Sequence, residues 1–207
     1  MKENRSLPAE LLAGRTLIFQ LARNDFKKKY AGSYLGIVWA FVQPVVTVMV
    51  YWFVFGMIRS SSPRPVPFVL WLIAGLIPWF FFQDGLTNGT NALLEYNYLV
   101  KKVVFQIDIL PMVKVVSAMF VHLFFILVAL ILYTAMGYYP TIYTIQVIYY
   151  TFCAFVLILG ISYMTSSVVV FFRDLTQVIN IALQVGVWMT PIMWSMEDLG
   201  ITGILAS

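Results

Sequence analysis

Five apolar stretches follow one another along the chain and are separated by more polar connections. They cover residues about 35–58, 66–82, 112–136, 142–172 and 178–194. Each is about as long as a helix that crosses the roughly 30 Å of hydrocarbon in a bilayer. A backbone that spans the bilayer must satisfy its own hydrogen bonds, which favours an α-helix for every stretch. The pattern therefore predicts an all-α integral membrane protein with five transmembrane helices.

The segment before the first apolar stretch is too charged to cross a bilayer, but its pattern is helical. Leu12, Phe19 and Phe26 recur at seven-residue spacing, and Arg15 and Arg23 lie between them. This composition is typical of a helix that lies in the membrane interface with its apolar face toward the acyl chains. A plain cytoplasmic leader is the alternative. A cleavable signal peptide is not expected, because polar and basic residues come first.

Composition narrows the class of protein further. Of the 207 residues, 61% are hydrophobic and 11% are charged, whereas an average soluble domain has about 25% charged residues. A soluble fold of this size has too little interior for so much apolar side chain. The composition excludes an ordinary soluble enzyme, a disordered segment and a disulfide scaffold. Because the chain has one cysteine and one histidine, no metal site is expected.

The placement of the 13 Lys and Arg residues sets the expected orientation. Eleven of them lie before the first span, at residues 101–114 or at residue 173, and the opposite side holds only Arg59 and Arg64. Cytoplasmic loops of membrane proteins carry an excess of Lys and Arg. We therefore expect a cytoplasmic N-terminus, cytoplasmic loops at 83–111 and 173–177, and outer loops at 59–65 and 137–141.

The longest polar connection, residues 83–111, is expected to contain a short helix outside the membrane. That helix would present Leu93, Leu94, Tyr98 and Leu99 without enough length to cross the bilayer. Exposed apolar and aromatic groups of this kind usually need a partner surface. Packing on the chain's own membrane helices is the alternative.

Two ionisable residues lie within the third apolar stretch, where such groups are usually functional candidates. Lys114 lies near the inner end of the stretch, so its long side chain is expected to reach the interface. His122 lies about 12 Å deeper along the helix. A neutral imidazole bonded to a neighbouring helix is favoured there over a proton relay, which would need acidic partners at that depth.

Proline and glycine positions suggest how the helices pack. Pro44 and Pro191 are predicted to kink the first and fifth helices, because proline removes a helix hydrogen bond. Gly85 and Gly89 match the pattern of small residues that lets membrane helices approach closely. Glycines at a membrane edge can instead end or bend a helix.

Aromatic residues make up 17% of the chain. Their ordinary role in a membrane protein is anchoring at the interface. A sharper hypothesis is a stacking surface for sugar rings, whose C–H faces suit aromatic planes. The residues to which this hypothesis applies are Trp39, Tyr51, Trp52 and Trp188.

Three motifs occur in order along the chain. Residues 23–36 read RNDFKKKYAGSYLG and are followed by Trp39 and Pro44; residues 99–103 read LVKKV, with ILP at 109–111; and residues 172–175 read FRDL, with TPI at 190–192. Together they resemble the ABC-2 type transporter permeases, in particular the branch that exports O-antigen, capsule and teichoic acid. The resemblance covers nearly the whole chain, although that family has six spans and five are predicted here.

The resemblance implies a half-transporter that forms a homodimer in the bacterial plasma (inner) membrane and binds two ABC ATPase subunits. The chain has no G-x-x-x-x-G-K-[ST] phosphate-binding loop, so ATP and Mg are expected on the partner subunit and no cofactor on this chain. The resemblance also implies a coupling helix seated on the ATPase and a gate formed by the interfacial helix. The coupling residues would be Leu93, Leu94, Glu95, Tyr96, Asn97, Tyr98, Lys101, Lys102, Arg173 and Asp174. The gate residues would be Arg23, Asp25, Phe26, Lys27 and Tyr30.

The function that follows is that of a permease rather than an enzyme. It would move a lipid-linked polysaccharide or teichoic-acid-type polymer outward from the cytoplasmic side, with no nucleic acid as partner. The alternative is an ABC-2 exporter of a drug or lipid, which would have the same fold. Less favoured are a secondary transporter, which normally has broken-helix or ionisable sites at the midplane in both halves, and a membrane transferase.

Overall fold

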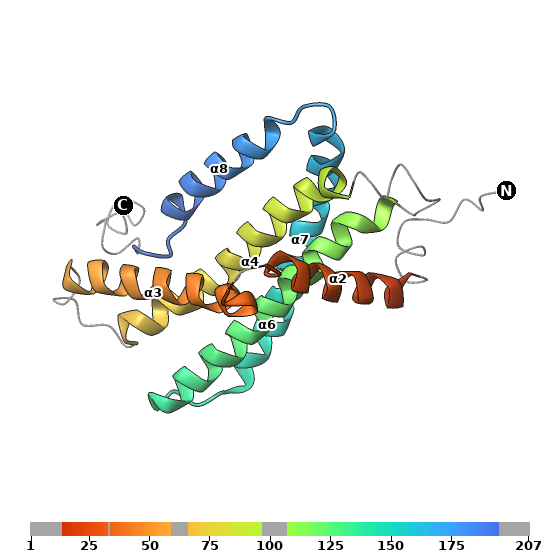
Figure 1. Cartoon of the computed structure of the whole chain (residues 1–207). Helices are drawn as coiled ribbons and strands as arrows, with labels where there is room; N and C mark the ends of the chain where they lie inside the picture. The colour runs from red at the N-terminus through yellow and green to blue at the C-terminus, as the bar shows by residue number, and fades with distance from the viewer. Residues whose placement is uncertain (1–13, 33, 59–65, 97–106, 195–207) are drawn as a thin grey trace, which may run out of the picture.

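The computed structural model describes residues 14–32, 34–58, 66–96 and 107–194, and the elements within these ranges are helical (Figure 1). This confirms the all-α fold class. The longer helices are α2 (Arg15–Lys29), α3 (Trp39–Ile58), α4 (Phe68–Glu95), α6 (Leu110–Ala135), α7 (Gln146–Val169) and α8 (Leu175–Met189). Short 3-10 helices precede three of them, at η1 (Gly36–Val38), η2 (Ile107–Ile109) and η3 (Ile142–Ile145).

Among the described residues, four helical stretches are long and apolar enough to cross a membrane. They are Gly36–Met57, Phe68–Glu95, Ile107–Ala135 and Ile142–Val169. The fifth predicted span corresponds to α8, which has 15 residues. At about 1.5 Å per residue such a helix is about 22 Å long, which is shorter than the hydrocarbon core. The first four predicted spans are therefore confirmed, and the fifth is a shorter apolar helix.

The predicted kink at Pro191 is wrong, because α8 ends before this residue. The helix finishes at Met189, and Thr190 is extended, with φ −77° and ψ 136°. A residue that precedes proline is pushed out of the α region by the proline ring, so Pro191 stops the helix instead of bending it. Pro44 does lie inside α3, and Pro78 lies inside α4.

The polar connection predicted at residues 83–111 begins later in the structure, after Glu95. α4 continues without a break from the second span to Glu95, so residues 83–95 are helical. The polar side chains that suggested a loop are bonded to neighbouring helices: Thr90 shares a 2.8 Å hydrogen bond with Thr165, and Thr176 donates to Asn91 at 2.8 Å. Because these partners satisfy the polar groups, the helix continues.

Gly85 and Gly89 act as packing residues in this extension of α4. A Cβ atom on Gly85 would lie 2.9 Å from Cγ2 of Ile158, and one on Gly89 would lie 2.3 Å from Oγ of Ser162. Both neighbours belong to α7. The two glycines therefore let α4 and α7 approach closely, as the small-residue pattern indicated.

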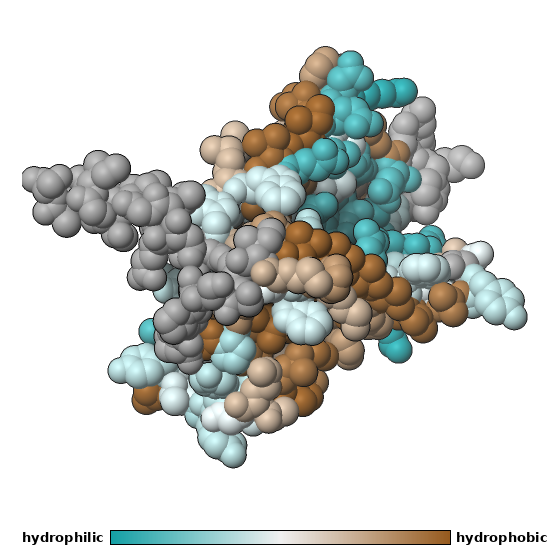
Figure 2. All heavy atoms as spheres, turned by 90° about the vertical axis from the view of Figure 1, so that its left-hand side faces the viewer, coloured by the Kyte–Doolittle hydropathy of each residue, from teal (hydrophilic) through white to brown (hydrophobic). Residues whose placement is uncertain are grey.

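α4 is the central helix, and α3, α6, α7 and α8 all pack against it. In its most apolar window 44% of the residues are buried, against 6% for α3. α3 therefore leaves most of its apolar surface uncovered by the rest of the chain. Figure 2 shows apolar side chains over much of one face, and hydrophilic ones gathered toward the top, where Figure 1 places the turn between α7 and α8.

The segment for which an interfacial helix is predicted does form a helix, α2, which crosses α6 (Figure 1). Ile18 and Ala22 are buried against Ile109 and Val113 at the start of α6. The basic residues Arg23 and Lys27 are exposed. α2 thus rests one face on the bundle and presents its basic face outward.

Candidate functional site

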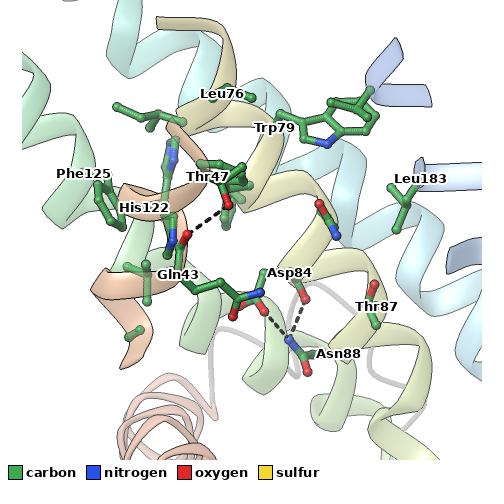
Figure 3. Close-up of a pocket in the computed structure, with 18 of the residues that line it drawn as sticks. Gln43, Thr47, Leu76, Trp79, Asp84, Thr87, Asn88, His122, Phe125 and Leu183 are labelled. Carbon is green, nitrogen blue, oxygen red and sulfur yellow. Dashed lines mark hydrogen bonds between the residues drawn. The ribbon is translucent and has the colours of Figure 1, made fainter. Parts of the chain in front are cut away.

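A pocket of about 720 Å³ lies between α3, α4, α6 and α8, and the C-terminal end of α2 borders it. Its volume is within the range of about 300–1,000 Å³ that is usual for ligand pockets. Figure 3 shows His122 and Phe125 of α6 on one side, Asp84 and Asn88 of α4 at the centre, and Leu183 of α8 on the other side. The pocket is therefore enclosed by helices that lie far apart in the sequence.

Polar residues line this pocket in pairs four residues apart, although the helices are otherwise apolar. Side chains at i and i+4 lie on the same face of a helix, so each pair faces one side of its helix. The pairs are Gln43 and Thr47 on α3, Gln83 and Thr87 as well as Asp84 and Asn88 on α4, and Asn180 and Gln184 on α8. Hydroxyls, amides and a carboxylate thus converge from three helices on a shared space.

Among the described residues, only part of this polar lining is bonded to other groups of the chain. Asn88 Nδ2 donates to the Asp84 carbonyl at 2.7 Å and to Asp84 Oδ1 at 2.9 Å, and Thr47 donates to the Gln43 carbonyl at 3.0 Å. Thr87 Oγ1 lies 3.5 Å from Asn180 Oδ1. Amide groups carry several donor and acceptor positions, so the lining retains capacity to bond a polar ligand.

Aromatic and aliphatic side chains form the rest of the wall. Of the predicted sugar-stacking residues, Trp39, Tyr51 and Trp188 line the pocket, whereas Trp52 is not part of its lining. Tyr51 and Trp188 belong to different helices, and their ring centroids are 6.4 Å apart. Trp79 of α4 also lines the pocket, although it is not among the predicted sugar-stacking residues. Its ring covers α8 at Gly186, where a Cβ atom would lie 2.9 Å from Trp79 Cη2.

The end of α2 lies at one edge of the pocket. Lys29 Nζ forms an ion pair with Asp84 Oδ1 at 2.5 Å, and Tyr30 lies beside this pair on the pocket lining. Burial alone would lower the pKa of Lys29, but the Asp84 carboxylate raises it above the ordinary 10.5. Burial raises the pKa of Tyr30 as well. Lys29 is therefore a cation and Tyr30 a neutral phenol at physiological pH.

A buried cluster of charges lies below α2, and it corrects the expectation that Lys114 reaches the interface. The side chain of Lys114 is 6% exposed, and its ammonium bonds Asp25 Oδ1 at 2.7 Å. It also pairs with Glu95, and the Tyr96 hydroxyl donates to Asp25 at 2.9 Å. Because the Asp25 carboxylate of α2 pairs with the Lys114 ammonium, Lys114 has a counter-charge within the protein and does not have to extend to the interface.

The predicted coupling residues occupy different environments. Tyr96 is buried and bonded to Asp25, and Leu93 packs beside Ala92 and Leu110, while Leu94 is half-buried. Arg173 and Asp174 are exposed in the turn between α7 and α8. Residues outside the described ranges include Asn97, Tyr98, Lys101 and Lys102.

The predicted gate residue Phe26 and the deeper His122 both make aromatic contacts. Phe26 of α2 lies edge-on to Tyr30 and to Phe120 of α6. His122, a pocket-lining residue of α6, stacks on Phe81 with 4.5 Å between ring centroids, and its Nε2 lies 3.4 Å from Thr151 Oγ1. The contact with Thr151 is the bond to a neighbouring helix that the sequence favoured. Within the described ranges, His, Cys, Asp and Glu residues form no cluster of three that could hold a metal ion.

Comparison with known proteins finds one family and several named relatives. The sequence profile of the family described as ABC-2 type transporter matches residues 16–205. An O-antigen export system permease protein RfbA of Myxococcus xanthus is 26% identical over 193 residues, which cover 93% of this chain and 74% of that protein. Two proteins of the same name from Klebsiella pneumoniae are 26% and 27% identical over 190 residues, which cover 87% of this chain and 70% of each relative.

Proposed function

The chain belongs to the ABC-2 type transporter family, and we propose that it is the transmembrane permease subunit of an exporter that moves a lipid-linked polysaccharide of the O-antigen type. Four helices long enough to span a membrane make it a multi-pass membrane protein. The observation that supports a polysaccharide as the substrate is the pocket lining, in which polar pairs on three helices lie together with aromatic rings. The printed names of the relatives support the same class of cargo.

The chemistry of a sugar polymer suits this lining. Sugar hydroxyls both donate and accept hydrogen bonds, and the amides of Gln43, Asn180 and Gln184 can do the same. The C–H faces of sugar rings pack on aromatic planes such as Tyr51 and Trp188. Ligand pockets usually have a small number of polar groups among hydrophobic and aromatic ones, whereas this lining has eight polar residues in four pairs beside its apolar ones. The polar pairs therefore favour a glycan over the alternative cargo of a drug or lipid.

The proposed complex contains two copies of this chain and two ABC ATPase subunits. The chain would lie in the bacterial inner membrane with its N-terminus in the cytoplasm, because Lys and Arg are concentrated on that side. The uncovered apolar surface of α3 is compatible with contact to a second copy. ATP and Mg would be bound by the ATPase subunits.

Coupling to the ATPase is proposed at the cytoplasmic end of α4 and at the turn between α7 and α8. Leu94 is half-buried at the first of these places, and Arg173 and Asp174 are exposed at the second. A displacement of packed helices by the motor can be transmitted to a gate as a rigid-body movement. α4 extends from this end to the pocket wall, so a movement of its end would reach the pocket directly.

Translocation in proteoliposomes tests this proposal. The chain and its ATPase are reconstituted, and an O-antigen-type lipid-linked glycan is followed by its accessibility to a glycosidase on the far side. Replacement of Gln184, which lines the pocket, by Leu should slow export at least about fivefold. The matched control is Gln177→Leu on the same helix, since Gln177 is exposed and is not part of the pocket lining. Equal export by the two variants, or export of a lipid or drug in place of any glycan, would contradict the proposal.

A further inference from the structure

Two ion pairs join α2 to α4 and α6. The order of the two charges along α2 is the reverse of the order of the charges that they meet. Asp25 and Lys29 lie four residues apart, so they share one face of α2. Opposite them lie Lys114 of α6, 2.7 Å from Asp25, and Asp84 of α4, 2.5 Å from Lys29. A negative and a positive group on α2 thus meet a positive and a negative group on the α4–α6 pair, and a shift of α2 by one turn would place like charges together.

The Asp25 end of this arrangement is the buried one. The Asp25 side chain is 9% exposed and that of Lys114 is 6% exposed. Asp25 also accepts a hydrogen bond from Tyr96, the residue that follows α4, and Lys114 also pairs with Glu95 in the last turn of α4. One carboxylate of α2 is therefore held by α6 and by the end of α4 together.

A small polar space joins the two ion pairs. It has a volume of about 10 Å³ and is lined by Asp25, Lys29, Asp84, Lys114 and Ser117, among others. That volume is about the space required by one water molecule. The two pairs consequently belong to one continuous polar seam, which runs from the end of α4 to the edge of the pocket.

The apolar contacts of α2 are made with the first half of α6. The buried residues of α2 are Ile18, Ala22 and Asp25, and Leu21, Phe19 and Phe26 of the same helix also contact this part of α6. If Lys114 lost its charge, the buried carboxylate of Asp25 would lose its ion-pair partner, which is strongly unfavourable. Lifting α2 into water relieves that penalty and breaks the apolar contacts of α2 with the start of α6.

We infer that Lys114 is a positioning residue that clamps α2 onto α4 and α6, and that the clamp couples the end of α4 to the edge of the pocket. Because Asp25 is bonded to Tyr96 and Lys114, a displacement of the end of α4 acts on α2. Because Lys29 is on the same helix as Asp25, α2 carries Lys29 away from Asp84 when it moves. The consequence for transport rests on the proposed function, whereas the clamp itself is a property of the chain.

The clamp is testable in the purified chain by thiol labelling, without ATPase or glycan. Cys153 is the single cysteine of the sequence, so Cys153→Ala gives a clean background. Ser117→Cys places a thiol in the small space below α2, and Ser166→Cys places one in α7; the two serines are 5% and 1% exposed. In detergent, both thiols should react slowly with a water-soluble maleimide.

Lys114→Met should raise the labelling rate of the thiol introduced by Ser117→Cys at least about tenfold, and it should leave that of the Ser166→Cys thiol unchanged. Lys114→Arg retains the charge and should restore most of the protection. If the thiol at position 117 stays protected in Lys114→Met, the clamp does not exist. If the thiol at position 166 becomes reactive to the same extent, Lys114 supports the whole fold and the specific role is overturned. If the labelling pattern is as expected but the reconstituted native exporter moves no glycan, the clamp is supported and only the proposed cargo is contradicted.

Discussion

Replacement of Gly89 by Ala tests how closely α4 and α7 approach. The added Cβ would lie 2.3 Å from Oγ and 2.7 Å from Cβ of Ser162, while its next neighbour, Val115, is at an ordinary 3.6 Å. Ser162 is fully buried and its backbone belongs to α7. Its Cβ cannot rotate away, so the two helices must separate by about 1 Å. We therefore expect Gly89→Ala to destabilise the chain.

The magnitude follows from comparison with a glycine that has space around it. Gly160 in α7 has no atom within 4 Å of its Cβ position, so Gly160→Ala gains helix propensity, about 0.5–1 kcal/mol, with no overlap. Gly89→Ala gains the same propensity and adds an overpacking cost of about 1–3 kcal/mol. The difference in unfolding free energy between the two variants therefore isolates the overpacking, and it should be about 1–3 kcal/mol.

Unfolding of the purified chain by SDS in mixed micelles, followed by tryptophan fluorescence, measures these differences. Ser162→Gly removes both atoms that the new Cβ would meet, so it provides the rescue. In the Ser162→Gly background, Gly89→Ala should be as favourable as Gly160→Ala is in the native chain. If Gly89→Ala is as stable as Gly160→Ala without the rescue, the close contact between α4 and α7 is refuted.

Three further predictions concern the ion pair, the coupling surface and the pocket wall. The folded-state pKa of Lys29 lies above 10.5, so the stability that this pair contributes is complete at lower pH and is lost only as pH rises through the folded value; the stability difference between the native chain and Lys29→Met should be constant from about pH 7 to 9.5 in SDS titrations, and a decline within that window would contradict the pairing. Leu94→Asp should uncouple ATP hydrolysis from export, and Leu93→Asp, at an equally half-buried position that packs beside Leu110, is the control for the loss of stability, measured as the SDS concentration of unfolding; export unchanged by Leu94→Asp would exclude this surface as the coupling site. Trp188→Ala should reduce glycan export at least about fivefold with little effect on stability, because its side chain is 55% exposed at the pocket, and native export by this variant would remove it from the path.

Hydrophobic pattern alone predicted the transmembrane helices well where packing does not alter the pattern. α3, α6 and α7 are close to the predicted spans, because an uninterrupted apolar run has one stable form in a bilayer. The family resemblance added the class of transporter, which the profile match over residues 16–205 confirms. The hydrophobic pattern does not show that α8 ends at Met189. The local signal for this end is Pro191, two residues later.

Long-range polar contacts explain the remaining errors. Residues 83–91 look like a break between helices because Thr90 and Asn91 are polar, and their partners Thr165 and Thr176 lie far away in the sequence. Lys114 looks like a residue that reaches the interface for the same reason, since its partner Asp25 is 89 residues away. A local pattern contains no information on which distant polar group will satisfy a given side chain.

The pocket shows both what was predictable and what was not. Trp39, Tyr51 and Trp188 were chosen as aromatic residues of the first and fifth spans, and the packing of α3 and α8 around α4 brings all three to one cavity. The polar pairs at i and i+4 are visible in the sequence, but spacing alone does not show that they face one cavity. Their convergence depends on how three helices are rotated about their axes, which is determined by packing rather than by local sequence.

The most direct test of the central claim is the rate of ATP hydrolysis by the reconstituted complex of this chain with its ATPase. Candidate lipid-linked glycans, unglycosylated lipid carrier and apolar drugs are added separately to proteoliposomes. The account predicts that an O-antigen-type lipid-linked polysaccharide stimulates hydrolysis several-fold over the carrier lipid alone, and that Gln184→Leu reduces this stimulation. Stimulation by a drug or simple lipid, with no response to any glycan, would contradict it.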